Sequence, residues 1–314
     1  MGAEDTMTKQ SLQKAPKVSV LMTIYNAAPY LKEAIDSIVA QTYGDWELIA
    51  VENGSLDESP MILRSYGDER IRAFVLPENI GRTPALRYAF EQARGEYTAV
   101  LDADDVSYPE RLMKQVAYLD QHPEVGVVGT WAKLINRLGE EIGGMEPPVD
   151  GYELYEVLGW SNPIAHSTIM YRAEHAKRLS GYPAAYTYAQ DLALILALSR
   201  ISRISVMGEY LCKYRVIASS VSRNPKMLLN IGQEQLALLQ EVAEVIPLSE
   251  MAIKRNHHRQ AVAQLKIGVA LVRERQVIAG LKLIALAIIK DPKILMVNGV
   301  VERLFSIGGS SRWF

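Results

Sequence analysis

Three aspartates stand close together directly after a short apolar run of the sequence. Asp102, Asp104 and Asp105 follow Tyr97–Leu101 at once. This run is too short for a typical helix and predicts a buried strand, while Pro109 marks the start of a helix. Carboxylates crowded at the end of a buried strand repel one another unless a cation such as Mg²⁺ or Mn²⁺ neutralises them. The pattern predicts a divalent metal site, although Asp104 and Asp105 would also suit the cap of the following helix.

Four motifs occur in a fixed order around these aspartates. They are VSVLMTIYN, QTYGDWELIAVENGS, NIGRTPALRYAF, and LDADD followed by YPERL. Together they resemble the family 2 glycosyltransferases, over roughly residues 17–220. The resemblance implies the GT-A fold and an inverting enzyme that uses a nucleoside diphosphate sugar, with a UDP-sugar expected first. The sugar would go to a hydroxyl of a glycan or lipid-linked acceptor, in cell-surface polysaccharide or glycoconjugate synthesis.

The resemblance also implies roles for residues on the donor side. Asp102 would lie against the nucleotide ribose, with Ala103 beside it, and Asp104 would hold the divalent metal, Mn²⁺ or Mg²⁺, on the diphosphate. The other nucleotide-sugar-binding residues that it implies are Thr23, Tyr25, Glu52, Asn53, Asn79 and Arg82. Asn53 stands where the family usually has a second acid. Because an amide both donates and accepts, the choice among uridine, thymidine and guanosine donors stays open.

On the acceptor side, the resemblance implies that Asp191 is the catalytic base. The family has a Glu-Asp pair here, and this chain has Gln190 before Asp191, so the base is the half that is kept. His166 and Arg215 would lie on the acceptor or phosphate side. From the residues alone, Asp191 would equally be the N-cap of a helix, and a lone histidine before a strand is more often structural than catalytic.

The elements that must position these residues follow from the apolar pattern. Apolar, β-rich runs alternate with segments of helical periodicity, which predicts a mostly parallel, doubly wound α/β sheet flanked by helices, with its ligand site at the carboxyl ends of the strands. The predicted strands are 17–24, 46–51, 71–76 and 97–101, and the helices between them are 30–41, 57–65 and 83–93. Beyond them, the sequence predicts a hairpin within 125–144 and a strand over 168–171.

The motifs of the sequence argue against two other classes of function, a sugar nucleotidyltransferase and an inactive binding module. The chain has neither the Gly-x-Gly-x-x-Gly motif after the first strand nor a P-loop, so dinucleotide binding and P-loop kinase chemistry are not supported. A sugar nucleotidyltransferase would need a glycine-rich loop where VLMTIYNAAPY stands. An inactive nucleotide- or glycan-binding module is the other alternative, and the presence of Asp102, Asp104 and Asp191 together argues against it.

Charge and cysteine content limit where the chain works. The formal net charge is −2, with about −7 in residues 1–224 and about +5 in residues 225–314. The single cysteine, Cys212, excludes an internal disulfide framework and suits a reducing cytosol. Residues 1–16 are polar and predict a disordered leader without a membrane anchor. We expect a cytoplasmic protein without a nucleic-acid partner, and the sequence leaves open whether it attaches peripherally to the inner face of the cytoplasmic membrane.

The rest of the chain divides into a predicted catalytic domain, 17–222, and a helical C-terminal region, 223–314. Small and apolar residues between Leu265 and Pro292 have the spacing of one tetratricopeptide-like helix pair. Such a pair cannot bury its own apolar face, so it must pack on the catalytic domain, on another chain in a homo-oligomer, or at a lipid surface. For Val277–Ile289 a packed bundle helix is favoured over a helix in the bilayer interface.

Overall fold

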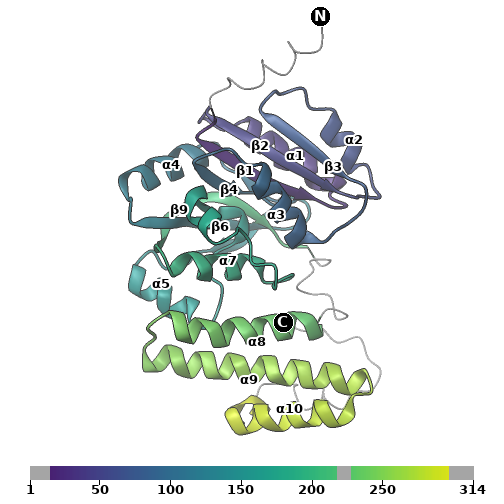
Figure 1. Cartoon of the computed structure of the whole chain (residues 1–314), viewed down its shortest axis with the longest axis vertical. Helices are drawn as coiled ribbons and strands as arrows, with labels where there is room; N and C mark the ends of the chain where they lie inside the picture. Colours follow the sequence, from purple (N-terminus) through teal and green to yellow (C-terminus); the bar gives the residue numbers. More distant parts are fainter. Residues whose placement is uncertain (1–14, 218–227, 297–314) are drawn as a thin grey trace, which may run out of the picture.

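The computed structural model describes residues 15–217 and 228–296. The predicted leader lies almost wholly outside the described residues, as does the predicted domain boundary at 222–223, and both stay predictions. Figure 1 shows a twisted sheet with helices on both faces and, at one end of the molecule, a stack of three helices from the C-terminal region.

The first half of the sheet is parallel and built from βα units. Four strands pair in the order β3-β2-β1-β4. The elements are β1 (Val18–Ile24), α1 (Ala28–Val39), β2 (Trp46–Asn53), α2 (Ser59–Arg64), β3 (Ile71–Leu76), α3 (Arg82–Gln92) and β4 (Tyr97–Val100). All the strands and helices predicted here are present, with ends that differ by a few residues.

The second half of the sheet is mixed. β8 pairs antiparallel with both β4 and β6, and β6 pairs parallel with β9. The elements are β5 (Val106–Ser107), α4 (Arg111–Gln121), β6 (Val125–Ile135), β7 (Glu141–Met145), α5 (Gly151–Leu158), the 3-10 turn η1 (His166–Thr168), β8 (Met170–Arg172), α6 (Ala173–Arg178), α7 (Gln190–Ser199) and β9 (Arg203–Arg215). The predicted hairpin is β6 with β7. The predicted α/β fold class is confirmed.

The strand predicted over 168–171 begins two residues late. Thr168 ends the 3-10 turn η1, because both its backbone N and its Oγ1 donate to Ala165 O, at 2.9 and 2.7 Å. Local side-chain hydrogen bonds of this kind compete with strand pairing. His166 therefore lies on a 3-10 turn that directly precedes β8.

Helices cover both faces of the central strands, which explains their nearly continuous apolar sequence. In β1, Leu21 packs into one apolar cluster with Phe90 of α3. Its neighbour Met22 points to the other face and packs into a second cluster with Ile35 of α1. The period of two along the strand therefore divides the core into two layers, and the polar residues gather where the strands end.

The C-terminal helices α8 (Leu228–Val245), α9 (Glu250–Arg273) and α10 (Val277–Lys290), followed by the turn η4 (Pro292–Met296), stack in chain order away from the sheet (Figure 1). α8 joins the sheet layer, because Leu238 and Val242 belong to the apolar cluster that includes Leu194 of α7. α9 and α10 form the predicted helix pair. They cross at two glycines, where a Cβ on Gly280 would lie 2.6 Å from Gly268 O.

α8 also contributes a carboxylate to the start of α7. Glu234 accepts hydrogen bonds from the backbone N–H groups of Thr187, Tyr188 and Ala189, at 2.8, 2.7 and 3.0 Å. Ala189 is the N-cap residue of α7 and has no side chain that could accept such bonds. A carboxylate from a distant part of the chain thus satisfies donors that precede the helix and complements its dipole.

Among the helices that the structure describes, none is both long and apolar enough to cross a membrane.

Candidate active site

The residues predicted to bind the donor meet at one edge of the sheet. β2, β1 and β4 are neighbouring parallel strands, so their carboxyl ends lie side by side. Tyr25 follows β1, Glu52 and Asn53 end β2, and Asp102 follows β4. The parallel order of the strands therefore brings separate motifs of the sequence into one site.

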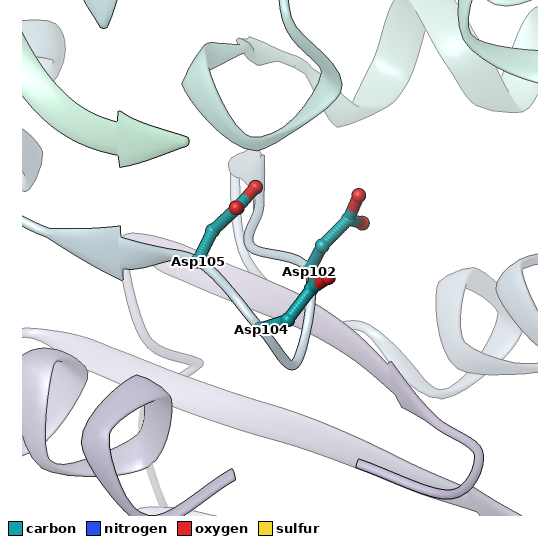
Figure 2. A group of neighbouring side chains, drawn as sticks. All are labelled: Asp102, Asp104 and Asp105. Atoms are coloured by element: carbon teal, nitrogen blue, oxygen red, sulfur yellow. The ribbon is translucent and has the colours of Figure 1, made fainter. Parts of the chain in front are cut away.

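The tight turn that connects β4 to β5 carries Asp102, Asp104 and Asp105 (Figure 2). One carboxylate oxygen of each lies within 4.8 Å of those of the other two. α4 begins further along the chain, with Glu110 at its N-cap, so the alternative that Asp104 and Asp105 cap this helix is wrong. A cluster made of oxygen ligands suits a hard cation such as Mg²⁺ or Mn²⁺.

Asp102 is held as a carboxylate by two neighbours. Arg82 donates from Nη2 to both carboxylate oxygens, at 2.6 Å each, and His166 Nδ1 lies 3.4 Å from Asp102 Oδ1. Burial alone would raise the pKa of Asp102, but the charge of Arg82 and the contact with His166 outweigh it and lower that pKa well below its usual range. Asp102 is therefore charged before any ligand binds.

Asp104 forms no ion pair of its own with any residue that the structure describes. Burial and the neighbouring charge of Asp102 raise the pKa of Asp104 to about 6, and the more distant charge of Arg82 only partly opposes this. The guanidinium of Arg82 is already engaged by Asp102. A half-buried carboxyl whose ionisation is opposed by its surroundings is what a cation site requires, so the residues present fit the predicted metal.

Asp105 points into the protein and connects three segments. It is 1% exposed and accepts hydrogen bonds from Ser167 Oγ and from the backbone N of Arg215, the latter at 2.7 Å. Burial and the charges of Asp104 and Asp102 raise the pKa of Asp105. Its contacts tie the aspartate turn to η1 and to the end of β9.

Arg215 fastens the same turn from the other side. Its guanidinium donates to Asp104 O at 2.8 Å, to Asn136 O at 3.1 Å and to Glu33 Oε2 at 2.5 Å, and it lies 4.6 Å above the ring centre of Tyr30. Its predicted place on the acceptor or phosphate side stays a prediction. The contacts themselves favour a positioning role, because each nitrogen of the guanidinium already donates to the protein.

His166 is buried behind the ion pair of Asp102 with Arg82. Its Nδ1 lies 3.3 Å from Arg82 Nη2, and its Nε2 lies 3.0 Å from Tyr182 Oη. Its predicted contact with acceptor or phosphate stays a prediction. Sequence reasoning assigned no role to Tyr182, or to Ser167, which binds Asp105 and accepts from Asp102 N at 3.0 Å. Ser167 could have been suspected from its place beside His166, whereas Tyr182 carried no local signal.

Asp191 lies in the first turn of α7 and is half-buried. The N-cap of this helix is Ala189, so the alternative of Asp191 as a cap is wrong. Instead, Asp191 Oδ2 accepts a hydrogen bond from Asn162 Nδ2 at 2.8 Å. This leaves the other carboxylate oxygen without a partner among the hydrogen bonds of the described residues.

Gln190 links Asp191 to the donor side. With its amide oriented to suit its neighbours, its oxygen accepts from Arg82 Nε at 3.0 Å and its nitrogen donates to Thr187 O at 3.1 Å. Arg82 therefore contacts Asp102 through one nitrogen and Gln190 through another. The negative charges of Asp104 and Asp191 also stabilise its positive charge. One guanidinium serves as the common neighbour of the predicted ribose, metal and base carboxylates.

At the base end of the site, Asn53 is largely used by the protein. Its Nδ2 donates to Asn79 Oδ1 at 3.1 Å and to Gly81 O at 3.2 Å, and its Oδ1 accepts from Ile80 N at 3.0 Å. An aspartate could not make the two donated bonds. Asn53 therefore holds the loop before α3, and one acceptor lone pair of its oxygen remains for a base.

The other residues predicted to line the base pocket differ in exposure. The ring of Tyr25 is 46% exposed and available for stacking. Thr23 is half-buried near the end of β1, and Glu52 is buried and accepts from Ser55 N at 2.6 Å. Ala103 is buried inside the aspartate turn. Their predicted contacts with a nucleotide stay predictions.

The comparisons with known proteins agree with this geometry. The model of "Glycosyl transferase family 2" matches residues 19–179. The O-antigen biosynthesis glycosyltransferase WbnJ of Escherichia coli is 32% identical over 221 residues, which are 68% of this chain and 85% of WbnJ. The family match covers the segment that carries the four parallel strands and the aspartates described above.

Two solved structures have a similar fold at low sequence identity. TarS of S. aureus (residues 1–349, with UDP-GlcNAc) has a TM-score of 0.60 at 20% identity and covers 80% of this chain and 72% of its own. The mannosyltransferase PcManGT of Pyrobaculum calidifontis, with GDP-Man and Mn²⁺, has a TM-score of 0.58 at 21% identity, over 94% and 82%. The family match and the 32% identity to WbnJ show that this chain belongs to glycosyl transferase family 2.

Proposed function

We propose that the protein is an inverting glycosyltransferase that moves a sugar from a nucleoside diphosphate sugar to a hydroxyl group of a glycan or lipid-linked acceptor. The observation that carries this proposal is the position of Arg82, whose guanidinium neighbours Asp102, Asp104 and the residue before Asp191. The carboxylates proposed to serve the metal, the ribose and the acceptor thus lie around the guanidinium of Arg82. This arrangement suits a site in which a donor diphosphate and an acceptor hydroxyl group would be brought together. WbnJ, a relative, is named for O-antigen biosynthesis, which supports a role in cell-surface glycan synthesis.

The donor would be bound by residues of β1, β2 and β4. Tyr25 offers a stacking face for the base, Asn53 one acceptor for its edge, and Asp102 an acceptor for ribose hydroxyls. A UDP-sugar is the first expectation, and a GDP-sugar is the alternative, since the two structural relatives hold UDP-GlcNAc and GDP-Man. The transferred group, hexosyl or N-acetylhexosaminyl, would be set by loops around this site.

Asp104 would hold Mg²⁺ or Mn²⁺, with Asp102 close by. When bound, the cation would offset the negative charge that builds on the leaving diphosphate. Asp191 would take the proton from the acceptor hydroxyl as its oxygen bonds to the anomeric carbon and the bond from that carbon to the diphosphate breaks. Asn162 orients this carboxylate. Attack from the face opposite the diphosphate inverts the anomeric configuration.

The experiment is a panel of UDP-, GDP- and dTDP-sugars, each tested for thermal stabilisation and for hydrolysis with Mn²⁺, Mg²⁺ or chelator. We expect one donor class to raise the unfolding temperature, because a ligand of the native state stabilises it by mass action, and the same class to be hydrolysed only with metal. Stabilisation without turnover of any donor, with acceptors added, would instead support an inactive binding module. Release of pyrophosphate from a nucleoside triphosphate and a sugar phosphate would support a nucleotidyltransferase.

A further inference from the structure

One face of α10 is apolar and is not covered by any residue that the structure describes. The opposite face packs on α9 through Gly280 and Ala287. At 3.6 residues per turn, the uncovered apolar side chains fall mostly on the half of the helix that faces away from Gly280 and Ala287, so they form one stripe along the helix. The stripe consists of Val277, Ile278, Leu281, Leu286 and Ile289, which are 42 to 87% exposed.

A basic groove adjoins the end of this stripe. It has a volume of about 610 Å³ and lies between the first half of α9 and the residues that follow Ile289. Its lining includes the five cationic side chains Lys254, Arg255, Arg259, Lys290 and Lys293. Asp291 is the one carboxylate in the lining, and it is already paired with His258.

Three of the cations are not neutralised by any carboxylate of the described residues. Within 15–217 and 228–296, the side chains of Lys254, Arg259 and Lys293 have no ion pair with any carboxylate. Arg255 lies 5.2 Å from the ring centre of Trp160, a contact that leaves its charge in place. The groove is therefore a concentration of positive charge beside an apolar stripe.

We propose that this surface, the stripe of α10 together with the basic groove, binds an anionic membrane, with α10 lying in the plane of the bilayer interface. Apolar side chains would enter the boundary between headgroups and acyl chains, and the groove would bind headgroup phosphates. The 14 residues of α10 extend about 21 Å at 1.5 Å per residue, short of the roughly 30 Å of a bilayer core. The helix therefore lies on the membrane rather than across it.

The charges on this surface decide against the other occupants. A second copy docked by a two-fold axis would present the same patch, so it would bring a second set of these cations and no matching surplus of carboxylates. Residues 297–314 contain two arginines and one glutamate, so this segment offers no net negative charge to match the groove. The position of α10 agrees with binding to a membrane, because α10 lies at the end of the molecule farthest from the sheet (Figure 1). Its apolar stripe lies on the convex surface of a helix.

This inference goes beyond the proposed function and is tested without nucleotide. The full-length chain is sedimented with vesicles of phosphatidylcholine alone or with about 30% phosphatidylglycerol added. We expect binding to the anionic vesicles only, weakened by salt. Ile278→Ser with Ile289→Ser, and separately Lys254→Glu with Lys293→Glu, should each weaken binding about tenfold or more. The matched controls Met61→Ser and Lys177→Glu are as exposed but lie on the catalytic part, and they should bind like the wild type.

Three results would overturn the proposal: no vesicle binding by the wild type, equal binding to neutral and anionic vesicles, or full binding by both double variants. Sedimentation velocity covers the remaining alternative, since a dimer that the Ile278→Ser, Ile289→Ser variant dissociates would identify a second copy as the occupant. Thermal stabilisation by the donor, measured on the same variants, should be unchanged. It reports on the catalytic site separately, so that loss of membrane binding is distinguished from loss of the proposed activity.

Discussion

At the scale of single residues, the charge on Asp104 is the most demanding feature of the site. Burial and the charge of Asp102 raise the pKa of Asp104 to about 6, so a neutral amide of the same size should be tolerated by the fold. We expect Asp104→Asn to lower donor turnover about 10²–10³-fold, because the cation would lose its proposed ligand, while the unfolding temperature stays unchanged or rises. Steady-state hydrolysis with added Mn²⁺ measures this. Asp45→Asn, an exposed change at the opposite end of β2, is the matched control, and activity of Asp104→Asn in chelator would contradict the assignment.

Asp191 differs from Asp104 because its proposed role concerns only the acceptor. Asp191→Asn keeps the size of the side chain, yet an amide cannot take a proton from a hydroxyl. Transfer should fall by about 10²–10⁴-fold, the usual worth of a positioned base, with donor and metal affinity unchanged by calorimetry. If donor binding were lost and turnover at saturation kept, Asp191 would be a donor ligand and the base would lie elsewhere.

At the scale of elements, one buried carboxylate joins β1, β2, β3 and the end of α3. Glu47 in β2 is 2% exposed and accepts from Ser19, Arg72 and Arg94. Burial alone would raise the pKa of Glu47, but these hydrogen bonds outweigh it and lower the pKa from its ordinary value of 4.5. The bonds thus stabilise the fold fully above about pH 4.5, and this stabilisation is lost as the pH falls through the lower, folded pKa.

Glu47→Gln should therefore cost about 1–3 kcal/mol of unfolding free energy at neutral pH. The difference from the wild type should shrink as the pH falls below about 4.5, because the wild-type carboxylate then takes up its proton. Urea unfolding at several pH values measures both effects. Glu69→Gln, an exposed change before β3, should show neither, and a pH-independent difference for Glu47→Gln would mean that packing rather than charge is responsible.

The contact of α9 with α10 makes a prediction of its own. A Cβ at Gly280 would meet Gly268 O and Val272 Cγ2 at 2.6 Å. Gly280→Val should therefore force the helices apart and destabilise this pair by about 1–3 kcal/mol. Hydrogen exchange should speed up in α9 and α10 and not in the sheet. Gly151→Ala adds a Cβ into open space at the start of α5 and should leave exchange unchanged throughout.

At the scale of the whole molecule, the sequence predicted local features of the chain far better than contacts between distant segments. The aspartate turn and the four parallel strands were predictable because each depends on residues close together in the chain. The direction of Asp105 was not, because its partners Ser167 and Arg215 are 62 and 110 residues away. The commitment of Asn53 to the loop before α3, and the contact of Tyr182 with His166, likewise depend on how distant segments pack.

Glu234 belongs to the C-terminal helices but contacts the segment before Asp191. Glu234→Gln replaces a charged acceptor of three backbone N–H groups by a weaker one. We expect transfer to fall about tenfold, because Asp191 is less well placed, while donor binding measured by calorimetry stays as in the wild type. Glu244→Gln, an exposed change on the same helix, should be silent. Equal losses for the two variants would attribute the effect to the stability of α8 instead.

The carboxylate of Glu234 also changes what counts as a separable part of this protein. A chain shortened at residue 217 would keep the whole sheet and every carboxylate of the donor site, and by sequence it would pass for a complete catalytic domain. It would lack the acceptor of the Thr187, Tyr188 and Ala189 amides. Such a chain should still bind and slowly hydrolyse a donor while transferring little to an acceptor. Hydrolysis without transfer in a truncated form would thus reflect a missing helix cap, not the true reaction of the enzyme.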